Sequence, residues 1–292
     1  MKIMICGCNG QIGQSLLKQT GIINHQVLAL NHSQLDITDK NAAKGIIETF
    51  SPDIIINAAA YTNVNKAQIE QDLAFKVNRD GAINLAQLAT QYNAILIHIS
   101  SDYVFSGQSL KPYTEEDIPY PCNVYGASKL AGEIGIAQYC PKHIILRTSW
   151  VFGEYGHNFF KTILNLAQTK TQLDIVGDQF GGPTSSDDIA STIFKIANQI
   201  YNQPINSSLW GIYHYCGLPY ANWAEITQNI IELAYGKMII HKKPIINQIQ
   251  SFEYDTLAKR PANSSLICSK VFEEFQIAPC NWKKALAKIF DK

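Results

Sequence analysis

The sequence predicts a doubly wound α/β fold, in which helices cover both faces of a parallel sheet. Short apolar runs alternate with helical patterns through the first 150 residues. The runs are apolar throughout, which is typical of strands buried on both faces of a parallel sheet. A glycine-rich turn also joins the first run to the first helix, at residues 7–13.

Five apolar runs predict the strands of this sheet, in the order residues 2–7 (KIMICG), 25–31 (HQVLALN), 52–60 (PDIIINAAA), 94–100 (AILIHIS) and 143–150 (HIILRTSW). Helical patterns separate the first four runs, at residues 11–19, 41–50 and 72–92. Right-handed crossovers between parallel strands then give a Rossmann-like, doubly wound sheet.

The alternation weakens after residue 150. Helical patterns near residues 158–168, 187–201, 222–235 and 280–290 are interrupted by short strands such as residues 172–177 and 211–216. We therefore predict a core over residues 1–150. Residues 151–292 should form a mixed α/β region that partly completes the sheet and partly builds a smaller C-terminal lobe, with a cleft between the two.

Composition excludes several classes of protein. The 24 basic residues balance 24 acidic ones without a basic block, which argues against a nucleic-acid partner. No stretch approaches the roughly 18 apolar residues of a membrane helix, so we expect no membrane segment. The seven cysteines have irregular spacing, without a metal-binding pattern, and predict free thiols in the cytoplasm and no metal ligands.

The glycine turn predicts a dinucleotide site. Gly7 would permit a tight turn, Gly10 would let the backbone approach a pyrophosphate, and Gly13 would let the helix pack closely on the sheet. The free N–H groups at the start of the helix would face the phosphates. We assign Gln11 and Ile12, between the last two glycines, to the same cofactor site.

The rest of the predicted cofactor site follows the second and third strands. Asn31 stands 18 residues after Gly13, where an acid usually binds the adenosine ribose, and an amide favours neither NADH nor NADPH. Asp36, with Ile37 beside it, could approach the adenine amine or simply start a helix. The small residues that end the third strand leave room for the cofactor, and we assign to it Ala58, Ala59, Ala60 and Thr62.

A proton donor for a ketone is predicted around residues 101–129. Lys129 follows Tyr125 by four residues, so a helix places both on one face. An ammonium near a phenol lowers the phenol's pKa toward working pH and prepares it to donate a proton. Ser101, at the end of the fourth strand, could orient the carbonyl group. We predict Ser101, Tyr125 and Lys129 as the catalytic residues.

These motifs resemble the extended short-chain dehydrogenase/reductase family, and within it the reductases of dTDP-linked 4-keto-6-deoxysugars. The segments that carry the resemblance span nearly the whole chain: residues 7–13, 52–68, 77–86, 100–107 (SSDYVFSG), 113–133 (YTEEDIPYPCNVYGASKLAGE), 146–153, 157–160, 178–190 and 259–266 (KRPANSSL). The resemblance implies reduction of the C4 ketone of dTDP-6-deoxy-L-lyxo-4-hexulose to dTDP-L-rhamnose by NADPH or NADH. The partner is then a dTDP-sugar, and the chain would act as a monomer or homodimer.

The resemblance also implies residue roles. Ser101 would polarise the ketone, Tyr125 would donate the proton, and Lys129 would hold the nicotinamide ribose. Asp102 and Trp150 fall at substrate-contacting positions, and Arg260 matches the arginine of the C-terminal signature. A guanidinium suits a diphosphate, and an indole suits stacking on a sugar or base. The alternative for Trp150 is a core aromatic residue.

One departure concerns a metal. Some members of the family bind Mg²⁺ at a dimer interface through acids, one of them on the first helix, where this chain has Ser15. Asp187 could match a second acid, but without the first a Mg²⁺-bridged dimer is doubtful, and we predict no metal ligand.

Two other functions remain open at this point. A 4,6-dehydratase or epimerase shares the architecture, but a dehydratase needs a second carboxylate after Asp102, where this chain has Tyr103. Reductases of other nucleotide-linked 4-keto-deoxysugars are also possible, and so is a non-catalytic NADP-binding regulatory subunit. The intact Ser101, Tyr125 and Lys129 favour an enzyme.

Overall fold

A parallel sheet forms the centre of the protein. The computed structural model describes residues 1–21 and 25–291. Within them, the central sheet has six strands in the order β10-β5-β4-β3-β1-β2, and every neighbouring pair is parallel. The doubly wound fold class is confirmed. The strands are β1 (Lys2–Cys6), β2 (Gln26–Leu30), β3 (Ile54–Asn57), β4 (Ile95–Ser101), β5 (His143–Thr148) and β10 (Gly211–His214).

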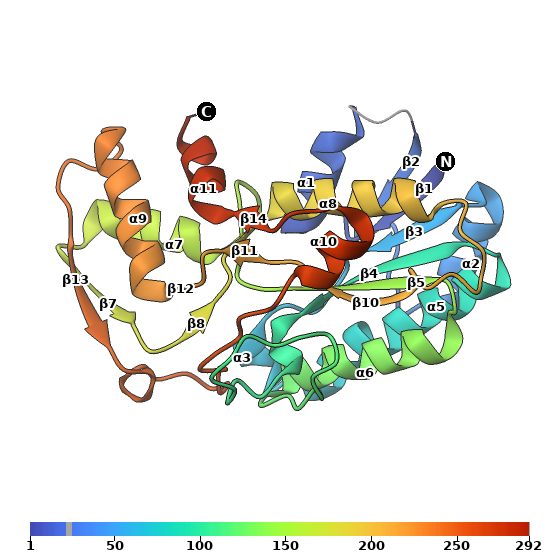
Figure 1. Cartoon of the computed structure of the whole chain (residues 1–292), viewed down its shortest axis with the longest axis horizontal. Helices are drawn as coiled ribbons and strands as arrows, with labels where there is room; N and C mark the ends of the chain where they lie inside the picture. The colour runs from blue at the N-terminus through green and yellow to red at the C-terminus, as the bar shows by residue number, and fades with distance from the viewer. Residues whose placement is uncertain (22–24, 292) are drawn as a thin grey trace.

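Helices cover both faces of this sheet (Figure 1). Helices α1 (Gln11–Thr20) and α8 (Ser186–Ile200) lie on one face, and α2 (Lys40–Phe50), α5 (Ala82–Gln91) and α6 (Val124–Tyr139) lie on the other. Successive side chains of a strand point to opposite faces. Accordingly Ile3 and Ile5 join one buried cluster and Met4 and Cys6 join the other. Burial on both faces explains the consecutive apolar residues of β1, β3 and β5.

The single helix predicted over residues 72–92 is interrupted. The chain forms α4 (Gln71–Phe75), a π-helical segment η1 (Lys76–Gly81) and then α5. Asn78, in η1, is buried and hydrogen-bonds the backbone of Tyr61 and the hydroxyl of Ser128 on α6. Gly132 of α6 approaches so closely that a Cβ there would lie 2.2 Å from the Asn78 carbonyl oxygen. The π-helical turn therefore lies where Gly132 of α6 packs directly on the backbone of η1.

The rest of the chain forms a second group of elements beside the sheet (Figure 1). Helices α7 (Phe159–Thr169), α9 (Trp223–Gly236) and α11 (Trp282–Phe290) lie there with a parallel pair of strands, β7 (Gln172–Val176) and β13 (Ile245–Ile249). We call residues 151–291 without α8, β10 and α10 (Ser269–Phe275) the lobe. Short elements complete the chain: α3 (Val64–Ala67), η2 (Asp102–Val104), β6 (Val151–Phe152), β8 (Phe180–Gly181), β9 (Thr184–Ser185), β11 (Gly217–Leu218), β12 (Ala221–Asn222), η3 (Ser251–Glu253) and β14 (Cys280–Asn281).

Three elements after residue 150, namely α8, β10 and α10, belong with the sheet, and Phe275 of α10 packs against Tyr213 of β10. Strand β10 pairs with β5 in register from Gly211 and Ile144 onward, and α8 packs against α1. Within residues 1–21 and 25–291, no helix combines the length and the apolar character needed to span a membrane.

Candidate active site

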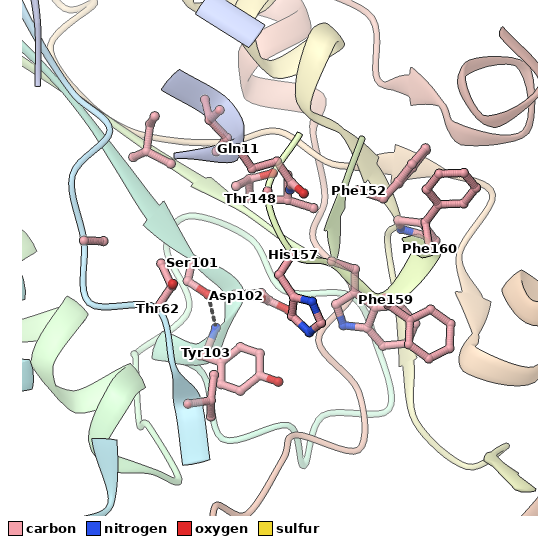
Figure 2. Close-up of a pocket in the computed structure, with 18 of the residues that line it drawn as sticks. Gln11, Thr62, Ser101, Asp102, Tyr103, Thr148, Phe152, His157, Phe159 and Phe160 are labelled. Carbon is pink, nitrogen blue, oxygen red and sulfur yellow. Dashed lines mark hydrogen bonds between the residues drawn. The ribbon is translucent and has the colours of Figure 1, made fainter. Parts of the chain in front are cut away.

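A cavity of about 610 Å³ lies at the carboxyl ends of the strands, where the sheet meets the lobe. Ligands of open α/β sheets bind at this edge. Figure 2 shows Ser101 and Asp102 at the end of β4, with Phe159 and Phe160 of the lobe across the cavity. The predicted residues that line it are Gly10, Gln11, Ile12, Ala58, Ala60, Thr62, Ser101, Asp102, Tyr125, Lys129, Trp150 and Arg260.

The glycine turn at one end of the cavity requires glycine. Gly7 has φ +80°, and a Cβ there would lie 2.6 Å from the backbone of Ala59. A Cβ on Gly13 would lie 2.3 Å from the Gly7 carbonyl oxygen. That same oxygen accepts the N–H of Gly10 at 3.0 Å. The turn therefore brings the first residues of α1 to the cavity with bare backbone exposed, as a pyrophosphate needs.

Six predicted cofactor residues lie outside the cavity lining, among the residues that the structure describes: Gly7 and Gly13, which shape the turn, and Asn31, Asp36, Ile37 and Ala59. Asn31 accepts the backbone N–H groups of Ser33 and Gln34 and so shapes the loop after β2. The Asp36 carboxylate accepts the N–H of Thr38 at 2.9 Å. Ile37 is buried beneath Gly81, and Ala59 packs against Gly7. Their assignment to the cofactor stays a prediction.

The three predicted catalytic residues come together. Ser101 ends β4, and Tyr125 and Lys129 lie on successive turns of α6, whose N-terminus is capped by the Asn123 side chain. The Ser101 hydroxyl accepts the N–H of Tyr103 at 3.1 Å and donates to Asp102 Oδ1 at 2.9 Å. Figure 2 shows the first of these bonds. Since Tyr125 and Lys129 also line the cavity, one carbonyl group could meet a hydroxyl and a phenol together.

The Tyr125 phenol does not show the lowered pKa that the sequence predicts. Burial raises the pKa of Tyr125 to about 12, and a hydrogen bond with Ser101 offsets only part of this shift. Lys129 directs its amine elsewhere in this geometry. Its Nζ lies 3.1 Å from His98 Nε2 and donates to the Ile99 carbonyl at 2.7 Å. Burial lowers the pKa of Lys129 to about 8, and the nearby Glu133 opposes that shift.

Asp102 is a buried carboxyl group at the floor of the cavity. Only 1% of the residue is exposed, and burial raises its pKa to about 7. Its Oδ2 has no hydrogen-bond partner among the described residues. The same is true of the buried Thr148 Oγ1, which also lines the cavity. Both residues line the cavity, and hydrogen bonds with Ser264 and Ser101 offset part of the rise in the pKa of Asp102.

The lobe side of the cavity is aromatic. Trp150 stacks on Trp223, with ring centroids 3.6 Å apart and planes 6° apart, and Phe159 adjoins Trp223 at 4.5 Å. Trp150 has φ +45°, which is unusual for a bulky residue and is found at constrained functional sites. A Cβ on Gly181 would lie 2.5 Å from the Trp150 ring. Trp150 is thus held by Trp223 and by a glycine, in a half-buried position at the cavity.

Sequence reasoning missed several residues of the cavity, including His157, Phe159, Thr148 and Trp223. His157 and Phe159 lie within the segment at residues 157–160, which carries the family resemblance but for which the sequence predicts no functional role. Trp223 begins α9 directly after its capping residue Asn222, so its sequence context predicts a helix start and no more. Only the three-dimensional fold brings it to Trp150.

Arg260 occupies the opening of the cavity toward a neighbouring groove of about 680 Å³. Its Nε is buried and has no hydrogen-bond partner among the described residues. Lys259 and Asn263 line the same groove. A guanidinium with an unused donor is suited to phosphate oxygens, which it can bind through two parallel hydrogen bonds.

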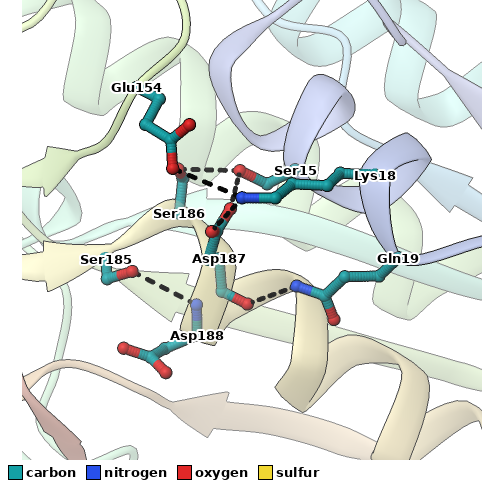
Figure 3. A network of polar contacts seen from close by, with 8 residues as sticks. All are labelled: Ser15, Lys18, Gln19, Glu154, Ser185, Ser186, Asp187 and Asp188. Carbon is teal, nitrogen blue, oxygen red and sulfur yellow. Dashed lines mark hydrogen bonds and ion pairs between the residues drawn. The ribbon is translucent and has the colours of Figure 1, made fainter. Parts of the chain in front are cut away.

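The residues around Ser15 do not fit a divalent cation (Figure 3). Ser15 donates to Asp187 Oδ1 at 2.8 Å, and the Lys18 ammonium contacts Asp187 at 2.9 Å and Glu154 at 3.3 Å. A lysine therefore already supplies positive charge to both carboxylates. Within residues 1–21 and 25–291, no cluster of three or more histidine, cysteine or acidic residues could hold a metal ion.

Comparison with known proteins gives one consistent result. The family model described as "RmlD substrate binding domain" matches residues 1–292. The chain is 44% identical over 292 residues to the dTDP-4-dehydrorhamnose reductase of Aggregatibacter actinomycetemcomitans, covering 99% of this chain and 98% of that protein.

Solved structures agree with that match. A dTDP-4-dehydrorhamnose reductase from Clostridium acetobutylicum superimposes with a TM-score of 0.91 at 34% identity, covering 100% of this chain and 99% of the other. The Bacillus anthracis enzyme of the same name, solved in complex with NADP, gives a TM-score of 0.90 at 33% identity, covering 99% and 98%.

Proposed function

This chain belongs to the dTDP-4-dehydrorhamnose reductase family, and on that premise we propose how its residues carry out the reaction. The chain is an NADPH-dependent oxidoreductase of dTDP-rhamnose synthesis. Its substrate is the 4-keto sugar dTDP-4-dehydro-L-rhamnose, and its product is dTDP-L-rhamnose. The residue roles below are our proposal.

One observation carries the assignment of roles: the glycine turn, the Ser101 hydroxyl, the Tyr125 phenol and the Lys129 amine meet in one cavity. The turn fits a cofactor, because Gly7 and Gly13 let strand, turn and helix pack closely, and Gly10 presents bare backbone to the cavity. When bound, NADPH supplies the hydride. Gly10, Gln11 and Ile12 would bind its pyrophosphate through the start of α1, with Ala58, Ala60 and Thr62 alongside.

Tyr125 is the proton donor for the ketone oxygen. Burial raises the pKa of the phenol to about 12, so the phenol keeps its proton throughout the physiological pH range. Ser101, which already bonds Asp102, would turn its hydroxyl to the same ketone oxygen and fix the carbonyl. Once the proton has left, an ammonium at Lys129 would stabilise the phenolate. General acid catalysis of this kind contributes on the order of 10²–10⁴ in rate.

The substrate's other groups meet the lobe. Trp150 offers an indole face to the sugar, with Trp223 fixing its plane, and Arg260 would bind the diphosphate. Asp102, protonated below about pH 7, could donate to a sugar oxygen through Oδ2. We accordingly propose residues 1–150 as the cofactor-binding core and residues 151–292 as the region that completes the sheet and forms the nucleotide-sugar lobe.

Two features support reduction over dehydration or passive binding. Asp102 is followed by Tyr103, so the second carboxylate that dehydration needs is absent at that position. A regulatory protein that only bound NADP would need neither Tyr125 nor its alignment with Ser101.

We also propose a cytoplasmic setting, because all seven cysteines are free thiols, which persist in reducing compartments. We expect a monomer or a homodimer that forms without Mg²⁺, since Lys18 takes the place of a cation beside Asp187.

The test is a turnover assay with NADPH across dTDP-, GDP- and CDP-linked 4-ketosugars. We expect rapid NADPH oxidation with the dTDP-linked sugar and much slower oxidation with the others. NADPH binding without turnover of any of these sugars would favour the regulatory function instead.

A further inference from the structure

A buried chain of hydrogen bonds runs from β3 to Lys129, behind the catalytic residues. The Ala59 N–H lies 3.1 Å from Asn57 Oδ1, and Asn57 Nδ2 lies 3.0 Å from His98 Nδ1. His98 Nε2 lies 3.1 Å from Lys129 Nζ, which donates to the Ile99 carbonyl at 2.7 Å. Asn57, His98 and Lys129 are each 1% exposed. None of the roles proposed above uses Asn57 or His98.

The direction of these hydrogen bonds is fixed at the β3 end. A backbone N–H can only donate, so the Asn57 atom facing Ala59 must be the amide oxygen. If the side-chain amide of Asn57 were rotated by half a turn, its NH₂ group would face the N–H of Ala59, and two donors would be opposed. Asn57 therefore presents its NH₂ group to His98, and His98 Nδ1 must accept.

This fixes the tautomer of His98. Burial lowers the pKa of His98 well below its usual range, so the ring is neutral. A neutral imidazole carries one proton. Because Nδ1 accepts from Asn57, that proton is on Nε2, and Nε2–H points at Lys129 Nζ. Only an uncharged amine, which has a lone pair, can accept it.

The hydrogen-bond donors and acceptors around Lys129 Nζ also indicate an uncharged amine. An ammonium has three N–H donors and no acceptor. Among the described residues, Nζ has a single acceptor partner, the Ile99 carbonyl, and faces a donor at His98. An uncharged amine would use one N–H on Ile99, accept from His98 through its lone pair, and direct its other N–H to the cavity. The buried environment also disfavours the charged form.

The other titratable groups around His98 and Lys129 do not change the conclusion that the uncharged amine of Lys129 is favoured. Glu133, on the same helix as Lys129, favours the ammonium, but its carboxylate is paired with Arg147 at 2.6 Å and accepts from Ser100. His143, on β5, bonds the Cys140 carbonyl, and its own pKa is lowered by burial.

The remaining titratable groups near Lys129 line the cavity or face solvent. Tyr125 of α6 and Asp102 of η2 share the cavity with Lys129, and burial raises the pKa of each. Arg79 and Asp80 of η1 pair with each other at the surface. The pKa of Lys129 is lowered to about 8, the direction that the geometry favours, and the uncharged amine is the majority form above about pH 8.

We propose that Asn57 and His98 are positioning residues that favour the uncharged amine of Lys129 in the free enzyme, so that NADPH binding in alkaline solution is accompanied by proton uptake at Lys129 Nζ. This inference rests on the proposed function, in which the cofactor occupies the cavity beside Lys129. The phosphates and ribose hydroxyls of the cofactor bring negative charge and acceptors to the amine, which then favour the ammonium. The proton comes from solvent, and the resulting ammonium is the form that stabilises the Tyr125 phenolate.

Calorimetry of NADPH binding in buffers with different ionisation enthalpies measures this proton directly. With a free-enzyme pKa of about 8, we expect uptake of about one proton per NADPH near pH 9 and about a tenth of a proton near pH 7. At these pH values the cofactor phosphates are already ionised and contribute little.

The isosteric variant Asn57→Asp should reverse the direction of the hydrogen bonds that join residue 57, His98 and Lys129. A carboxylate accepts from both Ala59 and His98, which moves the imidazole proton to Nδ1 and leaves Nε2 as an acceptor for Lys129. The ammonium then forms before NADPH binds, and proton uptake near pH 9 should fall at least twofold. His98→Leu removes the N–H donor and should have the same effect, so it serves if Asn57→Asp does not fold. His98→Gln, which can keep an N–H near Nε2, should restore the uptake.

The matched control is His214→Gln, because His214 is also fully buried but lies on β10, bonded to the Tyr113 carbonyl. A loss of stability alone would not change the number of protons, so His214→Gln should match the wild-type chain. NADPH binding near pH 9 without proton uptake, or unchanged uptake in Asn57→Asp, would overturn the inference and leave the proposed function standing. Failure of NADPH to bind at either pH would overturn both.

Discussion

The two sides of the cavity are built differently. On the sheet side, Ser101, Tyr125 and Lys129 come from one strand end and one helix, and their polar atoms are held by hydrogen bonds to backbone and to buried side chains. On the lobe side, Trp150 and Trp223 hold each other by stacking. The sheet side can therefore fix the reacting atoms, whereas the lobe side offers shape and apolar surface.

Because the two sides of the cavity differ in this way, substitutions on each side should affect a different kinetic quantity. A change on the sheet side should alter the chemical step, because those groups supply the proton and the charge. A change on the lobe side should alter binding of the sugar nucleotide, and leave the chemical step closer to normal. The following variants, in order of decreasing expected effect, test whether the two sides separate in this way.

The largest effect is expected from Tyr125→Phe. Removing the phenolic proton should lower kcat by about 10²–10⁴ and leave NADPH affinity within a few-fold of wild type. Steady-state kinetics and cofactor titration measure the two quantities separately. Tyr213→Phe, which removes another buried tyrosine hydroxyl outside the cavity, is the control. A fully active Tyr125→Phe variant would remove the distinction between the two sides.

Asp102→Asn should change how stability depends on pH. Burial raises the pKa of Asp102 from 3.8 to about 7, so its protonated form stabilises the fold at low pH and that contribution is lost as pH rises through about 7. The loss is on the order of a few kcal/mol. The melting temperature of the wild type should therefore fall more than that of Asp102→Asn between about pH 5 and 8.

The exposed Asp174→Asn is the control for that measurement. It should follow the wild-type curve. Parallel curves for Asp102→Asn and the wild type would mean that Asp102 is not the buried acid described above.

Trp223→Ala tests the lobe side. Loss of the stack with Trp150 should raise KM for the dTDP-sugar by about tenfold, since aromatic pairs contribute about 0.5–1.5 kcal/mol beyond their buried area. Trp223→Phe keeps an aromatic face and should recover most of the affinity. If Trp223→Ala lowered kcat as strongly as Tyr125→Phe, the lobe would take part in the chemical step.

The smallest effect is expected from Lys18→Met at the network in Figure 3. The Lys18 and Asp187 side chains are 36% and 39% exposed, so the pair should contribute about 0.2–1 kcal/mol to unfolding free energy. Chelation of divalent cations should leave both activity and mass in solution unchanged. A loss of either on chelation would show that a metal binds after all.

The sequence predicts the sheet side of the cavity well, because its residues lie in short segments. The spacing of Gly7, Gly10 and Gly13 and that of Tyr125 and Lys129 are local patterns with a direct structural meaning. Strands β1 to β5 follow from continuous apolar runs for the same reason. Arg260, although distant in sequence, was found only through the family resemblance.

The features that sequence reasoning missed depend on contacts between distant segments. Trp150 and Trp223 are brought together by the lobe, and Asn57 meets His98 only because β3 pairs with β4. The pKa of Tyr125 was predicted from its spacing to Lys129, but burial and the direction of the Lys129 amine decide it. The π-helical segment η1 likewise lies where Gly132 of α6 comes close to Asn78, which is a contact between distant segments.

Transfer of a deuterium label tests the central claim most directly. The wild-type chain is incubated with NADPH that carries deuterium at both C4 positions of the nicotinamide, and the dTDP-sugar product is analysed by NMR. Hydride transfer beside Tyr125 predicts one deuterium at C4 of the sugar and protium on its new hydroxyl in ordinary water. Product formed without deuterium at C4, or with deuterium at another carbon, would contradict reduction of the C4 ketone in this cavity.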